Sequence, residues 1–266
     1  MPHADVNGLR WYYELNGPQE APVVVLANGI LADTYSWGAQ ERIFSKRYRV
    51  LVFDFPGQGR SDRLKAAVTV SEQAAGASIL LSALKLDPVH WIGVSYGGEV
   101  GLQLALAFPG QLRSLIIADS VASVDANLEG QVQAWLIAAK TGDHELLCAV
   151  SMPDIFSPAF IMTHPKVIAV SRQGYKQLDL ASVVYLLAEY HSYDVSEQLG
   201  RIRLPTLLLC GELDTLKPPS TMQAMADRLL DAEFITVPRA GHALPLERPA
   251  EFLTACLGFL SKQEVQ

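Results

Sequence analysis

The chain has 266 residues, half of them hydrophobic, so it can bury a sizeable core in one large domain or in one domain with an insertion. Its formal net charge is −7, without long runs of either sign, which argues against nucleic acid as a partner because phosphate binding needs a basic patch. The three cysteines, Cys148, Cys210 and Cys256, are far apart, which argues against both a disulfide framework and a zinc site.

The first quarter of the chain alternates between strand-like and helix-like segments. Residues 9–15 alternate in side-chain type and end at Asn16-Gly17, a pair that favours a hairpin turn. Short apolar runs follow at residues 23–27 and 50–53, and such runs are typical of strands buried on both faces of a parallel sheet. Residues 69–86 have the spacing of an amphipathic helix.

A serine lies at the junction of the next strand and helix. The apolar run of residues 89–92 leads into Gly-Val-Ser-Tyr-Gly at 93–97, and residues 98–108 carry apolar side chains at helical spacing. This pattern predicts a nucleophile elbow, in which Ser95 occupies a sharp, strained turn with its hydroxyl exposed. Glycine is needed at both ends of the pentapeptide because a Cβ there would collide with the neighbouring strand or helix.

The alternation stops after the strand predicted at residues 115–118. Residues 120–203 are nearly free of strand signals and hold several helix candidates, and strands return at 206–210 and 234–237. The helix candidates of this stretch are 128–140, 145–150 and 180–190, and those of the C-terminal part are 219–230 and 249–260. Together the segments predict an α/β fold with a mostly parallel sheet. We expect a core of residues 1–120 and 201–266 and a helical cap of residues 121–200.

A serine nucleophile needs a base and a group that orients the base. Asp214 follows the strand at 206–210, and His242 follows the strand at 234–237. The carboxyl ends of parallel strands meet at one edge of the sheet, so these side chains and Ser95 are expected to lie close together. The order Ser95, Asp214, His242 is that of the α/β-hydrolase triad.

Two backbone N–H groups are predicted to form the oxyanion hole. One is that of Tyr96, directly after the nucleophile, and the other lies in the loop after residues 23–27. In that loop Asn28-Gly29 precedes Ile30, to which we assign the second donor, with Leu31 as the alternative.

Over essentially its whole length the chain resembles the α/β-hydrolase fold family of the helical-cap serine esterase and lactonase type. The matching segments, in chain order, are Asn28-Gly29, Trp37–Gln40, Asp54–Ser61, the elbow, Gly211–Asp214 and Gly241-His242. The family usually has His-Gly where this chain has Asn28-Gly29, and a histidine at the position of Gln58. The Asn-Gly loop is also similar to that of acyltransferases that make hydroxyalkanoyl lipids and to that of the enol-lactonase branch.

Three acidic residues near the predicted site have alternative interpretations. Asp119 also ends a strand and could supply the acid in place of Asp214, which the resemblance favours. Asp54 is interpreted as a turn-capping residue. Glu99, four residues after Ser95, either reaches solvent or a backbone N–H, or is a buried acid that hydrogen-bonds cap or loop residues near the site.

The sequence therefore predicts a cofactor-independent serine hydrolase, without a metal, for a small or medium apolar carboxylic ester, lactone or thioester. Predicted substrate-binding residues are Asn28, Gly29, Leu31, Trp135 and Phe156, the last two from the cap. An acyltransferase or perhydrolase using the same acyl-enzyme, and a slow ligand receptor, remain alternatives. With no signal-peptide pattern and no apolar run of the roughly 18 residues that a membrane span needs, a cytoplasmic protein is expected. The oligomeric state is left open.

Overall fold

The computed structural model describes residues 2–86 and 88–264. Within them, eight strands form one sheet in the order β1-β2-β4-β3-β5-β6-β7-β8. The strands are β1 (His3–Val6), β2 (Leu9–Asn16), β3 (Val23–Ala27), β4 (Arg49–Phe53), β5 (Val89–Val94), β6 (Leu112–Ala118), β7 (Thr206–Gly211) and β8 (Ala232–Val237). β1 pairs with β2, and β2 with β4, in antiparallel fashion, whereas all other neighbours are parallel. The predicted α/β fold with a mostly parallel sheet is confirmed.

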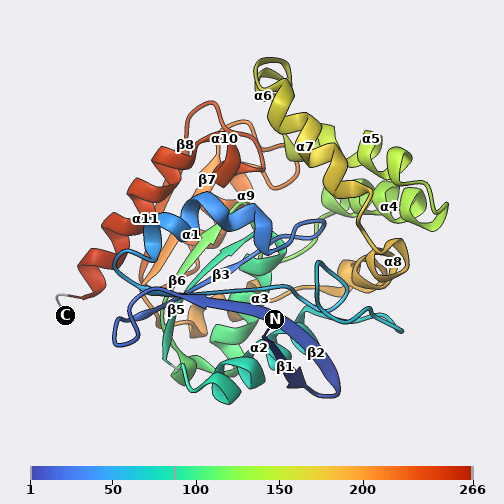
Figure 1. Cartoon of the computed structure of the whole chain (residues 1–266). Helices are drawn as coiled ribbons and strands as arrows, with labels where there is room; N and C mark the ends of the chain where they lie inside the picture. Colours follow the sequence, from blue (N-terminus) through green and yellow to red (C-terminus); the bar gives the residue numbers. More distant parts are fainter. Residues whose placement is uncertain (1, 87, 265–266) are drawn as a thin grey trace.

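Helices cover both faces of the sheet and gather at one end of it (Figure 1). They are α1 (Gly38–Phe44), α2 (Val70–Leu84), α3 (Tyr96–Ala107), α4 (Ala126–Lys140), α5 (His144–Ile155), α6 (Pro158–Thr163), α7 (Pro165–Tyr175), α8 (Leu180–Ala188), α9 (Pro219–Ala226), α10 (Leu244–Glu247) and α11 (Pro249–Gln263). Thr69 starts α2 with a reciprocal capping box, because its side chain accepts from the backbone of Glu72 and the Glu72 carboxylate accepts from the backbone of Thr69. No helix among the described residues has the length and apolar character needed to cross a bilayer.

The core has two layers, one on each face of the sheet. Alternate residues of β3 point to opposite faces, so Val25 joins the cluster under α2 and α3 whereas Val24 joins the cluster under α1 and α11. Every residue of β3 is buried. Continuous apolar runs therefore mark strands that are covered on both faces, as the sequence predicted.

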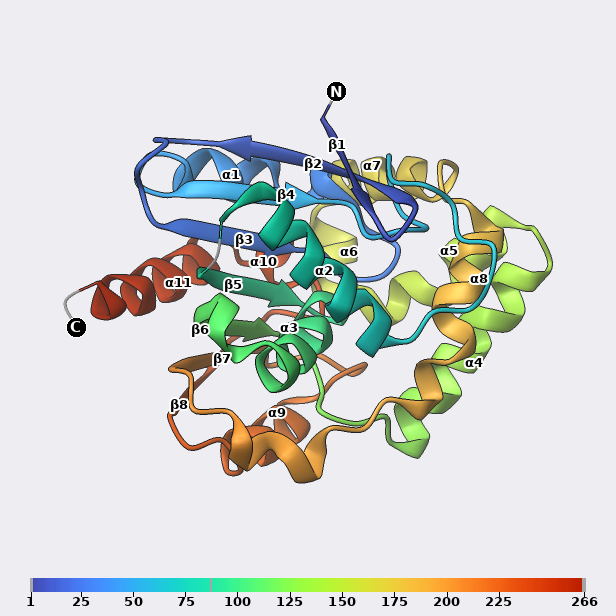
Figure 2. The same cartoon turned by 90° about the horizontal axis from the view of Figure 1, so that it is seen from below.

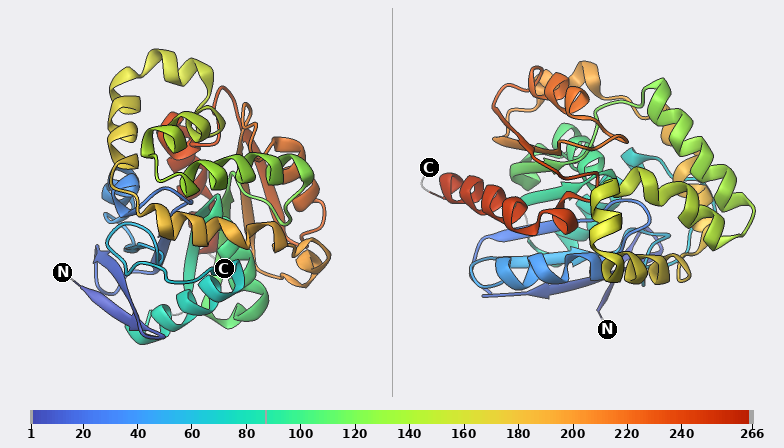
Figure 3. Two further views of the ribbon diagram at one scale, coloured as in Figure 1. Left: turned by 90° about the vertical axis from the view of Figure 1, so that its right-hand side faces the viewer. Right: turned by 90° about the horizontal axis from the view of Figure 1, so that it is seen from above.

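The helices α4 to α8 lie beyond the carboxyl ends of the parallel strands. Figure 2 shows the β5 arrow pointing toward the side of the molecule where α4 and α8 lie, and Figure 3 shows these helices together over that end of the sheet. This group connects β6 to β7 in the chain. We call residues 121–200 the cap; treating them as a separate unit stays a prediction.

Several elements differ from the sequence expectation. The predicted hairpin at Asn16-Gly17 is wrong, because β2 pairs with β1 and β4 and not with the next strand, β3. The tight turn instead lies at Asn7 and Gly8, whose φ angles of +53° and +81° suit this residue pair. The sequence does not predict the strand β1 or the helices α1, α6, α7 and α10, and α5 extends past the predicted residues 145–150.

Candidate active site

The turn between β5 and α3 holds Ser95 in a strained conformation. Its φ of +55° and ψ of −118° are unusual for a residue with a side chain, and its side chain is only partly buried. A Cβ on Gly93 would lie 2.2 Å from the carbonyl oxygen of Gly97, and one on Gly97 would lie 2.2 Å from that of Ala27. The two glycines thus let the chain turn tightly enough to expose the serine.

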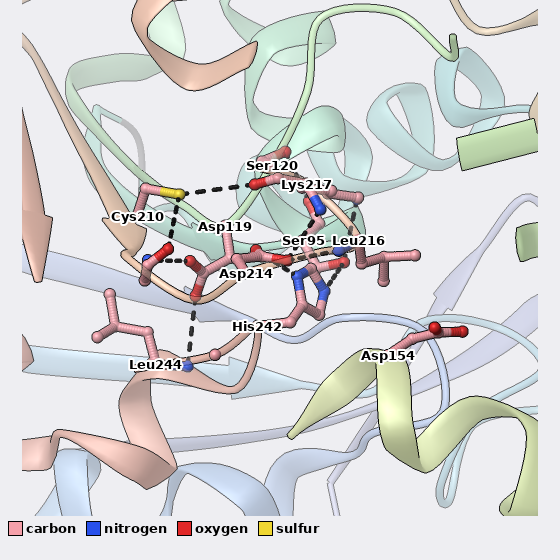
Figure 4. A network of polar contacts seen from close by, with 12 residues as sticks. Ser95, Asp119, Ser120, Asp154, Cys210, Asp214, Leu216, Lys217, His242 and Leu244 are labelled. Atoms are coloured by element: carbon pink, nitrogen blue, oxygen red, sulfur yellow. Dashed lines mark hydrogen bonds and ion pairs between the residues drawn. The ribbon is translucent and has the colours of Figure 1, made fainter. Parts of the chain in front are cut away.

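His242 and Asp214 form a hydrogen-bonded chain with this serine (Figure 4). His242 Nε2 lies 3.0 Å from Ser95 Oγ, and His242 Nδ1 lies 2.8 Å from Asp214 Oδ2. The other oxygen of Asp214 accepts the backbone N–H groups of Leu216 and Lys217 at 2.9 and 2.8 Å. The loop after β7 therefore fixes the orientation of the carboxylate, and the carboxylate fixes that of the imidazole.

Asp119, the alternative acid, holds loops together instead. Its carboxylate accepts the backbone N–H groups of Gly211 at 2.8 Å and Leu244 at 3.3 Å (Figure 4). Complete burial, and then repulsion by the nearby Asp214, raise the pKa of Asp119 well above its usual value. Asp119 thus links the end of β7, directly before the loop of Asp214, to the start of α10, directly after the loop of His242.

Asp119, Cys210 and Asp214 are close enough together that a metal site must be considered. Their ligand atoms lie within 4.8 Å of one another, and all three residues are buried. However, the carboxylate oxygens already accept backbone or imidazole hydrogen bonds, and burial raises the pKa of the Cys210 thiol, which favours the protonated form. These contacts explain the cluster without a cation: Asp119 links loops, and Asp214 orients His242.

The loop after β3 packs directly against the serine. A Cβ on Gly29 would lie 3.2 Å from Ser95 Cβ, and Leu31 adopts the left-handed conformation with φ of +66°. The Asn28 amide donates to the carbonyl oxygen of Ala32 at 2.8 Å and is 1% exposed, so it braces the loop from within. Ile30 lies between these residues; its role and that of Tyr96 as oxyanion donors stay predictions.

Asp54 and the two cap aromatics are also located by the structure. Asp54 accepts the backbone N–H groups of Thr34 and Arg60, which agrees with its interpretation as a turn-capping residue. Trp135 on α4 donates its indole N–H to Asp154 at 2.8 Å, and Phe156 stacks on Phe160 with ring centroids 5.6 Å apart. Trp135 and Phe156 are each 5% exposed, and their contact with substrate stays a prediction.

A buried ion pair lies next to the serine, and the sequence indicates only its acidic member, Glu99. Glu99, which is fully buried, pairs with Lys217 and accepts a hydrogen bond from the Tyr190 hydroxyl at 2.5 Å. Of its two interpretations, the buried acid near the site is therefore the one observed. Burial, and then the charge of Glu99, raise the pKa of Tyr190 well above its usual value.

Lys217 itself was missed by the sequence analysis. Its ammonium group lies 3.1 Å from Ser95 Oγ, and its side chain is 3% exposed. The available signal was a pair of opposite charges, Glu99 and Lys217, at positions that the fold brings to the same sheet edge.

The cap also contacts the loop that carries His242. Glu247 accepts the backbone N–H and the hydroxyl of Ser157, at 2.7 and 2.6 Å, and the backbone N–H of Gly241 at 3.0 Å. On the other side of the histidine, the N–H of Ala243 donates to the carbonyl of Ile155 at 2.9 Å. Both residues adjacent to His242 are thus linked to the end of α5 and the start of α6.

Comparisons with known proteins show the family to which the chain belongs. Residues 22–249 match the family described as alpha/beta hydrolase fold. The chain is 30% identical over 271 residues to the "Putative carbamate hydrolase RutD" of Caulobacter vibrioides, with 98% of both chains covered. It is 26% identical over 251 residues to 3-oxoadipate enol-lactonase 2 of Acinetobacter baylyi, with 90% of this chain and 89% of that protein covered.

The solved structures give the same result. The crystal structure of the enol-lactonase from Burkholderia xenovorans LB400 is 25% identical, with a TM-score of 0.92 and coverage of 98% of this chain and 100% of that one. The family match covers β3 to β8, the elbow and the loops of Asp214 and His242, and the structural match covers 98% of the chain. The chain therefore belongs to the α/β-hydrolase fold family and is a hydrolase.

Proposed function

We propose that this hydrolase cleaves a small or medium apolar carboxylic ester or lactone through an acyl-enzyme on Ser95. The observation that carries the proposal is the continuous hydrogen-bonded chain from Ser95 Oγ through His242 to Asp214, at 3.0 and 2.8 Å. It ends on a serine that the strained elbow leaves partly exposed. These are the groups that nucleophilic acyl transfer needs, each within hydrogen-bond reach of the next.

The geometry supports a two-step reaction without a cofactor. His242 takes the proton of Ser95 as Oγ attacks the carbonyl carbon, and Asp214 holds the imidazole in the tautomer with the proton on Nδ1. The N–H groups of Tyr96 and Ile30 stabilise the tetrahedral oxyanion, each by about 3 kcal/mol. His242 then returns its proton to the leaving alcohol, and water activated by the same imidazole releases the acid.

The proposed substrate class rests on the relatives and on the cap. Relatives over nearly the whole chain include proteins named as an enol-lactonase and as a carbamate hydrolase, both of which cleave a bond at an acyl-type carbonyl. The cap contributes aromatic side chains, among them that of Phe156. Phe156 follows Ile155, whose carbonyl oxygen accepts the backbone N–H of Ala243 in the His242 loop. We infer that these side chains line the acyl site, where they would favour apolar acyl groups.

The test is Ser95→Ala, with the exposed cap serine change Ser192→Ala as the control. Wild type and Ser192→Ala are expected to hydrolyse p-nitrophenyl esters and to be labelled by a fluorophosphonate probe, whereas Ser95→Ala is expected to do neither. Retained labelling or turnover in Ser95→Ala would contradict the mechanism. A series of esters of increasing chain length, together with lactones and carbamates, then measures the acyl group that the site prefers.

Product analysis separates the proposal from the two alternatives. With a hydroxy acid or hydrogen peroxide present, free carboxylic acid as the main product supports hydrolysis, whereas an acylated acceptor identifies a transferase or perhydrolase. Turnover of several esters at ordinary enzymatic rates argues against a slow ligand receptor.

A further inference from the structure

The buried lysine at the nucleophile has no role in the two-step reaction above. Lys217 lies in the loop between β7 and α9, and this one residue contacts two members of the triad. Its backbone N–H donates to Asp214 at 2.8 Å, and its ammonium group donates to Ser95 Oγ at 3.1 Å. Figure 4 shows Lys217 and His242 both reaching Ser95.

The ammonium group of Lys217 is paired with a buried carboxylate. Glu99 lies one turn after Ser95 on α3 and pairs with the ammonium group. The same carboxylate oxygen accepts from the Tyr190 hydroxyl, and the ring of Tyr190 lies 5.7 Å from the lysine nitrogen. Burying a charge is costly unless it is paired and hydrogen-bonded, and Glu99 and Ser95 supply these contacts to the ammonium group.

The lysine also orients the serine hydroxyl. A serine oxygen has one proton to donate and two lone pairs to accept with. An ammonium group can only donate, so the Lys217 contact occupies a lone pair and directs the Ser95 proton toward His242 Nε2. This is the proton that the base must remove.

We propose that Lys217 is a further catalytic residue, a charged hydrogen-bond donor to Ser95 Oγ that chiefly accelerates deacylation. The inference rests on the proposed acyl-enzyme function. In deacylation, His242 takes a proton from water, and the water oxygen bonds to the acyl carbon. The tetrahedral intermediate then breaks its bond to Oγ, whose electron pair stays on Oγ, and His242 returns the proton to that oxygen. The products are the free acid and Ser95.

The two half-reactions use Oγ in opposite directions. In acylation Oγ gives electron density to the carbonyl carbon, and a charged donor on Oγ restrains that attack. In deacylation Oγ is the leaving group and gains negative charge, which the Lys217 N–H stabilises more strongly in the transition state than in the ester. Loss of the lysine should therefore slow the release of the acyl group more than its arrival.

The experiment is pre-steady-state hydrolysis of a p-nitrophenyl ester by Lys217→Met. The deacylation rate is expected to fall about 100-fold, the lower end of the losses seen when one donor to a developing oxyanion is removed. The acylation rate should fall less than the deacylation rate, so the acyl-enzyme accumulates. A burst of p-nitrophenol then appears, kcat and KM both fall, and mass spectrometry detects the acyl group on Ser95. The matched control is Lys262→Met, which breaks an exposed ion pair with Glu233.

Two further measurements keep the test independent of folding defects. The double variant Glu99→Gln/Lys217→Met removes both charges with side chains of similar size, so it leaves no buried charge unpaired and should show the same burst. In Lys217→Ala, methylammonium should raise the deacylation rate, whereas tetramethylammonium, which has no N–H, should not. Equal stimulation by both ions would contradict the donor role.

The outcomes also separate this inference from the proposed function. If wild type is not labelled at Ser95 by a fluorophosphonate and turns over no ester, the acyl-enzyme function itself is wrong. If wild type is labelled and turns over ester, but the Lys217 variants deacylate at the wild-type rate, only the role of Lys217 is overturned.

Discussion

His90 is a buried imidazole near the start of β5, at the opposite end of this strand from the serine. It is 3% exposed, and its Nδ1 lies 2.8 Å from Ser114 Oγ. Burial, with a smaller repulsion from Arg113, lowers its pKa from 6.5 to about 4. The folded protein therefore keeps His90 neutral at a pH where the unfolded chain protonates it.

This difference predicts a pH-dependent contribution to stability. Between pH 6.5 and about 4 the unfolded chain binds more protons at His90 than the folded protein does, so stability falls as the pH falls through this window. The contribution reaches about 2–3 kcal/mol at the acid end. In His90→Gln, which can still hydrogen-bond Ser114, the fall in unfolding free energy measured by urea titration should be shallower by this amount. The exposed His191→Gln is the control; parallel curves for His90→Gln and wild type would contradict the prediction.

Single residues also show what a sequence can and cannot reveal about the site. Ser95, Asp214 and His242 could be found because each follows a strand with a recognisable apolar run, and strand ends meet at one edge. Lys217 could not be placed, since the loop sequence does not say whether a flexible four-carbon side chain turns inward or outward. Only its burial against Glu99 decides that direction.

Among the elements, the elbow allows a direct test of why glycine is required. Gly97→Ala would place a Cβ 2.2 Å from a backbone carbonyl of β3, which cannot move without disturbing the sheet. We expect a loss of about 3 kcal/mol or more in unfolding free energy, together with loss of fluorophosphonate labelling.

The control for this substitution is Gly130→Ala in the exposed part of α4. A Cβ there meets no atom within 4 Å, so the change should raise the unfolding free energy by about 0.5–1 kcal/mol through helix propensity. If both variants unfold at the same denaturant concentration, a steric clash is not the reason that position 97 requires glycine.

The link between the cap and the His242 loop gives a second prediction at this scale. In Glu247→Gln, one of the two acceptor oxygens becomes an NH₂ group that faces the donors of Ser157 or Gly241. The loop of His242 then loses a hydrogen bond that links it to the cap. We expect kcat/KM to fall about 10-fold or more, because a small displacement of the catalytic base slows the reaction strongly. Rates of ester hydrolysis and of fluorophosphonate labelling measure this.

Glu233→Gln on exposed β8 is the matched control, since it weakens only a surface ion pair. A Glu247→Gln enzyme that is labelled as fast as wild type would show that the cap contact does not position His242.

Three of the elements that the sequence does not reveal are very short. The helices α6 and α10 have only 6 and 4 residues, too short for a helical period to appear, and β1 has 4 residues of which only Val6 is buried. Their positions are set by tertiary contacts, such as the pairing of β1 with β2. Long buried strands such as β3 and β7 carry enough apolar residues to be recognised from sequence alone.

At the scale of the whole molecule, the sheet and parts of the cap differ in how deeply their side chains are buried. The central strands are buried almost completely on both faces, whereas α7 buries only Ile168 and Tyr175 among its 11 residues. Nearby, Met162 and Val170 are 81% and 72% exposed. The cap is joined to the sheet domain by polar contacts at Glu99, at Glu247 and between Leu64 and Ser182.

We therefore expect native-state hydrogen exchange to divide the chain by depth rather than by position in the sequence. Amides of β3, β5 and β6 should exchange only through global unfolding, with the full denaturant dependence, because opening them exposes both layers of the core. Amides of α6 and α7 should exchange through local openings at lower free energy, with little denaturant dependence. Amides of α4 and α8 should lie between these limits, because the two helices pack on each other and contribute many side chains to the larger core cluster. Mass spectrometry of peptic peptides at several urea concentrations measures this order. Equal exchange free energies for α7 and β5 would mean that the cap and the sheet unfold as one cooperative unit, in which case the cap could not open locally to admit substrate.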